Sequence, residues 1–255
     1  MDETNAPVVR SAATVALVRD GDDGLEAWMM RRAHGMAFAA GALVFPGGRA
    51  DQADADVSIG WHGDSPERLA GRLGVDAATA RVVVTAAVRE LFEEAGVLLT
   101  RPPVRSDVEA HRMAVEGRSR TFASVLAEHG CAVDVSGLVP WGRWVTPPGE
   151  SRRFDTWFFA VAAPEGLTAR SATSEAASAG WFAVGDVLER ADRREVLLLP
   201  PTVVMLRGLL AAGTVSGVLA AGPARSMEPV HPQITHNDDG TITVRGSGEL
   251  VLVRP

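Results

Sequence analysis

Two short apolar runs near the start of the chain predict a β-hairpin. They cover residues 11–19 and 25–31 and are separated by the segment DGDDG, whose Asp and Gly residues adopt turn conformations at little cost. The stretch from 40 to 48 follows and ends in Gly47 and Gly48. Because glycine lets the backbone approach another group closely, we expect a ligand near this loop.

The hydrophobic pattern becomes helical between residues 66 and 96. A first helix is predicted at 66–74, and a second begins at Asp76, a capping residue, and ends at Gly96. The apolar positions of the second helix recur at helical spacing and predict one buried side, formed by Ala87, Val88, Leu91 and Ala95. Residues 107–130 predict one or two further amphipathic helices.

The second half of the chain predicts strands, helices and a β-rich tail. Strands are expected at 139–147 and 154–164, and helices at 185–192 and from Pro200 to Gly213. After Gly222 the β-branched residues alternate around NDDG and GSG turns, which indicates a small terminal hairpin. We therefore expect one domain with helical insertions and a C-terminal β tail.

Composition narrows the class of protein. With 255 residues, 46% of them hydrophobic and 22% charged, the chain is long and apolar enough for a globular core. The net charge of −7 disfavours a nucleic-acid binder, and the single cysteine, Cys131, excludes an intramolecular disulfide. The N-terminus is acidic, and the longest uncharged run, 208–224, is shorter than the roughly 20 residues of a membrane span. We expect neither a secretory signal nor a membrane segment.

Three glutamates in the second predicted helix form the strongest candidate site. Glu90, Glu93 and Glu94 stand at i, i+3 and i+4, so they share one face of a helix and repel one another. A hard divalent cation would relieve that repulsion, because carboxylate oxygens suit Mg²⁺ and Mn²⁺, and Mg²⁺ is commonly shared with substrate phosphates. The alternative is a solvated acidic helix face, which is common on protein surfaces.

The glycine loop and the glutamates together resemble the Nudix box of the Nudix hydrolase superfamily. Gly48 matches the opening glycine, and the closing half is matched by Arg89, Glu90, Leu91, Glu93, Glu94, Gly96 and Val97. Asp54 stands where the family has glutamate, and 34 residues separate it from Arg89 where the family has seven, so we predict a 27-residue insertion within about 55–88. The flanking segments look most like the branch that includes peroxisomal coenzyme A diphosphatases. This resemblance covers about residues 11–210 and leaves an extension at about 223–255.

The resemblance implies an α/β protein with the Nudix fold, an α/β/α sandwich with a mixed β-sheet, made by residues 1–255 as a single domain. It also implies hydrolysis of a nucleoside diphosphate linked to another group, with Mg²⁺ or Mn²⁺ as cofactor. By their positions in the resemblance, Glu93 and Glu94 are expected to be the main metal ligands, and Glu90 a further ligand or the base. Arg89 orients a box carboxylate, while Gly47 and Gly48 let the loop approach metal and phosphates.

Several residues outside the matched positions are candidates with two interpretations. Glu175, just before a Trp-Phe pair, is either the general base or an extra ligand, as the resemblance implies, or an exposed loop glutamate. Asp51 and Asp54 share this ambiguity. Arginines could bind a substrate phosphate or lie exposed on the surface, namely Arg31, Arg32, Arg152 and Arg153.

Other chemistries are less favoured by the sequence. The six histidines lack zinc-ligand spacing, so surface or hydrogen-bonding roles are expected, and a Gly-x-Ser-x-Gly nucleophile motif is missing. The tryptophans of the second half are expected mainly in the core, with a smaller chance of stacking on a base.

Three functions remain open. The first is a diphosphatase acting on coenzyme A or acyl-coenzyme A, and the second is an ADP-ribose, dinucleotide or nucleotide-sugar diphosphatase. The third is a non-catalytic Nudix-like nucleotide-binding module, which the three glutamates disfavour. The chain ends in Val-Arg-Pro rather than a peroxisomal targeting tripeptide, so we expect a cytoplasmic protein. The β tail is compatible with a homodimer.

Overall fold

The predicted N-terminal hairpin is present in the computed structural model, which describes residues 8–33, 40–104, 108–164, 166, 176–236, 242–246 and 249–253. Strand β1 (Val9–Gly21) pairs antiparallel with β2 (Gly24–Arg32), and the register closes at Gly21 opposite Gly24. Gly24 has a φ of 113°, a value that glycine adopts readily, so the tight turn uses the glycine that the sequence places there.

The hairpin belongs to a seven-stranded mixed sheet. Its main path is β10-β2-β1-β9-β8, in which β1 and β9 run parallel and the other neighbours antiparallel. Two short strands attach at its side, β3 to β2 and β4 to β1. The remaining strands of this sheet are β3 (Leu43–Val44), β4 (Gly47–Arg49), β8 (Val139–Val145), β9 (Arg153–Ala162) and β10 (Ala176–Ala183).

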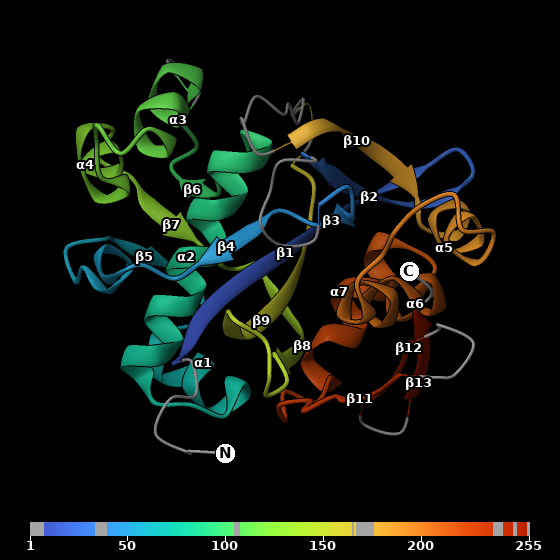
Figure 1. The fold of residues 1–255 in the computed structure, drawn as a ribbon. Helices are drawn as coiled ribbons and strands as arrows, with labels where there is room; N and C mark the ends of the chain where they lie inside the picture. Colours follow the sequence, from blue (N-terminus) through green and yellow to red (C-terminus); the bar gives the residue numbers. More distant parts are fainter. Residues whose placement is uncertain are drawn as a thin grey trace.

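Helices cover both faces of this sheet, as Figure 1 shows. On one face, Val15 and Leu17 of β1 and Phe159 of β9 pack in the core that contains helix α2 (Ala77–Ala95). On the other, Ala16 and Phe158 pack with helices α5 (Val184–Asp192), α6 (Pro200–Ala212) and α7 (Val215–Ala221). The side chains alternate between two cores because successive residues of a strand point to opposite faces. The α/β/α sandwich with a mixed sheet is confirmed.

Helix α2 begins and ends where its sequence predicts. The Asp76 side chain accepts a hydrogen bond from the Thr79 amide at 2.7 Å, and Gly96 ends the helix in the left-handed conformation with a φ of 67°. The four apolar positions predicted to share one side are fully buried, namely Ala87, Val88, Leu91 and Ala95. The helix therefore carries a large apolar side to the sheet and leaves the side with the glutamates near the loops.

The inserted segments build an outer layer beyond α2. Within the predicted insertion lie β5 (Trp61–His62), α1 (Pro66–Leu73) and the first part of α2. The predicted helical region near 107–130 forms two helices, α3 (Val108–Glu116) and α4 (Phe122–Glu128). A small sheet of order β5-β7-β6, which the sequence does not predict, joins these parts through β6 (Thr100–Arg101) and β7 (Ala132–Asp134). Its strands of two or three residues are too short to give a periodic signal.

The C-terminal part differs from the prediction in two respects. Residues 176–183 form β10 although alanine, serine and glycine favour strands weakly, because the segment pairs along β2. The tail forms a three-stranded antiparallel sheet instead of one hairpin, with β11 (Gln233–His236), β12 (Ile242–Gly246) and β13 (Glu249–Val253). The NDDG and GSG turns proposed there fall mostly on residues outside the described ones.

Short 3-10 turns complete the fold at Gln52–Ala55 (η2) and Gly222–Ala224 (η3). No single helix in the described part of the chain has the length and apolar composition of a membrane span. Helix α6 and the helical segment Val215–Ala224 pass that test only as a pair, with a bend of 111° between them.

Candidate active site

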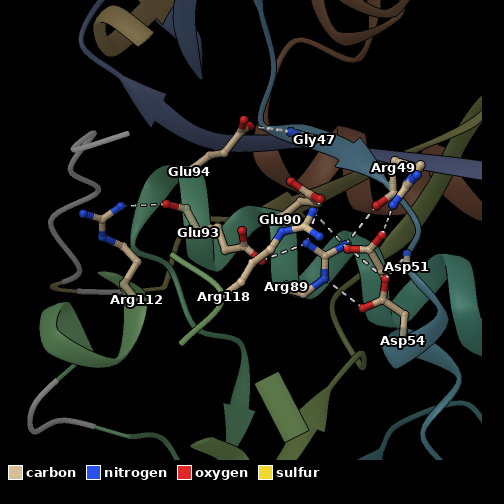
Figure 2. A network of polar contacts seen from close by, with 10 residues as sticks. All are labelled: Gly47, Arg49, Asp51, Asp54, Arg89, Glu90, Glu93, Glu94, Arg112 and Arg118. Atoms are coloured by element: carbon tan, nitrogen blue, oxygen red, sulfur yellow. Dashed lines mark hydrogen bonds and ion pairs between the residues drawn. The ribbon is translucent and has the colours of Figure 1, made fainter. Parts of the chain in front are cut away.

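The three glutamates lie on the last turns of α2, next to strand β4 (Figure 2). Helical spacing places Glu90, Glu93 and Glu94 on neighbouring turns, and the apolar side of the helix fixes them against the core. Glu94 is itself buried, with only 6% of its surface exposed. Buried carboxylates require compensation, which the Gly47 amide provides for Glu94 and the Arg89 guanidinium provides for Glu90 and Glu93.

The guanidinium of Arg89 lies at the centre of the carboxylates. Its Nε and Nη2 donate to the two oxygens of Asp54 at 2.8 and 3.0 Å. Its Nη1 donates to Glu90 at 2.7 Å and to Glu93 at 2.8 Å, and Nη2 also donates to the carbonyl of Arg49 at 3.0 Å. These contacts use one oxygen of Glu90 and one of Glu93, so the other oxygen of each remains for a cation.

Asp54 completes this arrangement despite its distance in sequence. It is 1% exposed and sits in η2, where its side chain accepts from the Asp51 amide at 2.7 Å in a reciprocal capping arrangement. Asp51 in turn pairs with Arg49 at 2.6 Å. Burial raises the pKa of Asp51, but the Arg49 hydrogen bond and the charges of nearby arginines outweigh it and leave that pKa below its usual value. The inserted residues therefore leave Asp54 in contact with Arg89.

Strand β4 brings two glycines against the glutamates. The Gly47 amide donates to Glu94 Oε2 at 2.7 Å, which ties the loop to the helix. A Cβ on Gly48 would lie 2.6 Å from a Glu90 oxygen, and one on Gly47 would lie 2.5 Å from the Ala13 carbonyl. At Gly47 the backbone leaves no room for a side chain, and at Gly48 a side chain would displace the Glu90 carboxylate, so the loop lies close to the box helix; the expected approach of a ligand to this loop stays a prediction.

The glutamates form part of the wall of a cavity of about 690 Å³. This volume suits a nucleotide-sized ligand. The lining combines distant parts of the chain: the β1 and β4 region, α2, the connection between β8 and β9, the start of α6 and the tail. Outside the box these lining residues include Arg32, Phe45, Glu116, Arg118, Trp144, Glu150, Arg152, Phe154, Pro200, Pro232, Ile234 and Val244.

The arginines predicted to bind a substrate fall into two groups. Arg32 and Arg152 line the cavity together with Gly47 and Gly48. Arg31 is not among the described lining residues, and its Nη1 donates to the Gly41 carbonyl at 3.2 Å. Arg153 donates to the Thr146 carbonyl at 3.1 Å and so secures the β8–β9 connection. Glu175 lies outside the described residues.

The donor set of this site fits a hard divalent cation. All three glutamates offer carboxylate oxygens, the ligand type that Mg²⁺ and Mn²⁺ prefer. Burial raises the pKa of Glu90 to about 7 although Arg89 favours the charged form, and the charge of Glu93 adds to the shift. Burial therefore disfavours the charged form of Glu90, and a cation at this place would favour it. These carboxylates and the glycine loop can hold a cation beside a phosphate group.

Comparison with known proteins places this arrangement in a family. The family model for the NUDT19 Nudix domain matches residues 77–209, more than half of the chain. The chain belongs to the Nudix hydrolases.

The relatives of this Nudix hydrolase point to one branch. Human acyl-coenzyme A diphosphatase NUDT19 is 27% identical over 276 residues, which cover 90% of this chain and 73% of the human protein. The Xenopus laevis protein of the same name is 25% identical and covers 85% of this chain and 69% of its own length. A crystal structure of a Nudix hydrolase from Alicyclobacillus acidocaldarius is 28% identical with a TM-score of 0.70, covering 84% of this chain and 96% of that one.

Sequence reasoning missed several parts of this Nudix site. Glu116 and Arg118 enter the cavity from the end of α3, and Pro232, Ile234 and Val244 enter from the tail. The segment around Arg118 contains several charged residues with no distinguishing spacing, and the tail was identified only as β structure. Nothing in a local pattern indicates that these segments reach the box, since folding alone brings them there.

A second cluster with metal-ligand residue types lies between α3 and α4. The ligand atoms of His111, Glu128 and His129 are within 4.8 Å of one another, and the two Nε2 atoms are 2.8 Å apart. Arg120 contacts His111 Nδ1 at 3.2 Å and Glu128 at 2.5 Å. Because arginine only donates, His111 Nδ1 accepts, and its Nε2 carries the proton donated to His129. Because these contacts engage both ring nitrogens of His111, we interpret the cluster as a hydrogen-bonded clasp between two helices.

Proposed function

We propose that the chain is a metal-dependent diphosphatase that hydrolyses the diphosphate bond of a nucleoside diphosphate linked to another group. The observation that carries this proposal is the Arg89-centred group of carboxylates, joined through Glu94 to the Gly47 loop, on the wall of a nucleotide-sized cavity. Family membership supports hydrolysis rather than binding alone. All three box glutamates are retained, which also disfavours a non-catalytic module.

Each residue of the site has a proposed role. Glu90, Glu93 and Glu94 would hold Mg²⁺ or Mn²⁺, which when bound neutralises phosphate charge and acts as a Lewis acid. Arg89 holds Glu90 and Glu93 in place through charge-assisted hydrogen bonds. Either Glu90 or Glu175 accepts the proton of the attacking water. Because both oxygens of Asp54 accept hydrogen bonds from Arg89, through its Nε and Nη2, we propose that Asp54 takes the place of the glutamate usual in the first half of the box.

We propose coenzyme A or an acyl-coenzyme A as the substrate to test first. The support comes from the relatives, which are named acyl-coenzyme A diphosphatases. The backbone at Gly47 and Gly48 would leave room for the diphosphate of the substrate. Arg32 and Arg152 would bind other anionic groups of the substrate, since all four residues line the cavity. We also propose that residues 1–255 act as one Nudix domain, because tail residues line the same cavity as the box.

A panel of substrates tests the proposal. Coenzyme A, an acyl-coenzyme A, ADP-ribose, NADH, a diadenosine polyphosphate and a nucleotide sugar would be incubated with Mg²⁺ or Mn²⁺, and products identified by chromatography and mass. Preferred cleavage of the coenzyme A compounds to a phosphopantetheine product is expected. Metal-dependent cleavage of another compound would support the proposed reaction and contradict coenzyme A as the substrate. No cleavage of any compound by folded protein would contradict a diphosphatase of this class.

Glu94→Gln tests the carboxylates themselves. The glutamine oxygen can still accept from the Gly47 amide, so the loop keeps its anchor while one negative charge is lost. We expect turnover to fall by about a hundredfold or more with Tm nearly unchanged, measured by product formation and thermal unfolding. Glu189→Gln, an exposed change on α5, is the control. Full turnover in Glu94→Gln would refute the proposed metal site.

A further inference from the structure

Arg118 stands at the mouth of the cavity in a conformation that its residue type disfavours. It follows α3 with a φ of 56°, in the left-handed region where glycine is the preferred residue after a helix. Its amide donates to the Val115 carbonyl at 2.9 Å, which closes the end of the helix. The preceding residue is Gly117, so the chain places arginine rather than glycine in the strained position.

A second arginine in the described residues has the same backbone conformation and serves as a comparison. Arg194 follows α5 with a φ of 63°, and its amide donates to the Ala191 carbonyl at 3.0 Å. Arg194 is not among the residues that line the cavity, whereas Arg118 is. The conformation alone therefore does not identify a site, and what distinguishes Arg118 is where its side chain lies.

The segment that carries Arg118 is held firmly against the box helix. Arg112 of α3 is fully buried and donates to the Glu93 carbonyl at 2.7 Å, so α3 is bonded to the last turns of α2. The clasp of His111, His129 and Arg120 joins α3 to α4 on the other side. The connection between the two helices, including Arg118, is thereby fixed relative to the carboxylates.

The guanidinium of Arg118 is available for a ligand. Its side chain is 79% exposed, and its contact with Asp51 is long, at 3.6 Å. Asp51 already binds Arg49 at 2.6 Å, so Asp51 does not depend on Arg118 for its compensation. Figure 2 shows Arg118 beside Glu93 and Asp51, where Arg49 and Arg89 are already paired with carboxylates and Arg118 adds an exposed positive charge. An anion held near the glutamates would meet this charge first.

We propose that Arg118 binds a phosphate oxygen of the substrate's diphosphate at the mouth of the cavity and exchanges its weak contact with Asp51 for that anion. Arginine suits this role because its planar donors match phosphate geometry. The inference rests on the proposed function for the identity of the anion, and it assigns substrate contact to a segment outside the box.

Binding of ADP, measured by isothermal titration with and without Mg²⁺, tests this contact without requiring turnover. Arg118→Ala is expected to raise the Kd by about tenfold or more, and Arg118→Lys by less, because a charge remains without the planar donors. Arg194→Ala keeps the wild-type Kd. Arg118→Gly and Arg194→Gly are both expected to raise Tm by relieving the left-handed conformation, while only the former weakens ADP binding.

Two results would overturn the inference: wild-type affinity for ADP in Arg118→Ala and Arg118→Gly, or failure of the wild-type protein to bind ADP under either condition. A purely structural role would lower Tm in Arg118→Gly, which is the opposite of the expected change. The proposed function is judged separately by turnover of the substrate panel. Weakened ADP binding in Arg118→Ala together with no turnover in the wild type would support the contact and contradict the diphosphatase.

Discussion

At the scale of single residues, the site depends on one arginine that satisfies several carboxylates at once. Arg89 is 8% exposed, and its contacts with Asp54, Glu90 and Glu93 are all 2.7 to 3.0 Å long. Burial opposes the charged guanidinium, but these neighbouring carboxylates outweigh it and raise the pKa of Arg89 further above its usual value. Planar, forked donors are needed for such a network, which a lysine lacks.

Arg89→Lys tests that requirement. The donors of a lysine ammonium diverge from one nitrogen and cannot bond both Asp54 oxygens and the two glutamates at once, so buried carboxylates would lose part of their compensation. We expect a loss of about 3 kcal/mol in the free energy of unfolding and a Tm lower by roughly 6–12 °C. Chemical and thermal denaturation would measure both. Arg193→Lys, whose side chain is 52% exposed, is the control, and equal stability of the two variants would contradict a buried network.

Gly48→Ala tests the contact between loop and helix. The added methyl group would lie 2.6 Å from a Glu90 oxygen, so Glu90 must move from its place beside Arg89. We expect activity to fall by about tenfold or more, with a small change in Tm. Gly71→Ala is the control, because a Cβ there meets nothing within 4 Å and a helix gains about 0.5–1 kcal/mol from the change. Unchanged kcat in Gly48→Ala would show that this close approach does not matter.

At the scale of elements, α2 supplies the site and α3 positions a part of it. The sequence predicts both helices, since Asp76 and Gly96 mark the ends of α2 and amphipathic spacing marks α3. The sequence does not indicate that these two helices pack against each other. An arginine such as Arg112 is usually exposed, and here it is buried because α3 packs against α2. Element type is thus a local property, whereas the angle and contact between elements are not.

Arg112→Met tests this contact. Methionine keeps much of the volume but leaves the Glu93 carbonyl and Glu109 without their donor. We expect the free energy of unfolding to fall by about 1–3 kcal/mol and ADP binding to weaken as the segment bearing Arg118 loosens. Denaturation and titration calorimetry would measure the two effects. Arg68→Met on α1, where the arginine side chain is 78% exposed, is the control. A variant that kept both stability and affinity would refute the positioning of α3.

At the scale of the whole molecule, the cavity combines segments that are far apart in the chain. Three residues of the tail line the cavity, namely Pro232, Ile234 and Val244. Val230 joins the tail to the main sheet, because its carbonyl accepts from the Val145 amide and its amide donates to the Arg143 carbonyl. The glutamates lie on a different element, so the tail forms part of the cavity wall without contributing to the carboxylates. We therefore expect substrate choice to depend on residues outside the box.

Val244→Ala tests this division of roles. Val244 is 4% exposed and lines the cavity, so two methyl groups of its wall would be lost. We expect KM to rise by about fivefold with kcat within about twofold, measured on the panel substrate that is cleaved best. Val57→Ala, at a residue 85% exposed, is the control. A fall in kcat without a change in KM would instead connect the tail to the reacting groups.

The sequence by itself determined the family, the α/β/α sandwich and the helix that bears Glu90, Glu93 and Glu94. The family and the sandwich follow from the resemblance to the Nudix box, whose two halves lie on either side of the insertion, and the helix follows from local spacing and capping residues. Only the tertiary structure decided that Asp54 meets Arg89 across the insertion and that Arg118 and the tail reach the cavity. It also separated Arg32 and Arg152 from Arg31, whose guanidinium bonds to a neighbouring loop. Contacts of this kind depend on how elements far apart in the sequence pack together, and such packing produces no periodic pattern of residues along the chain.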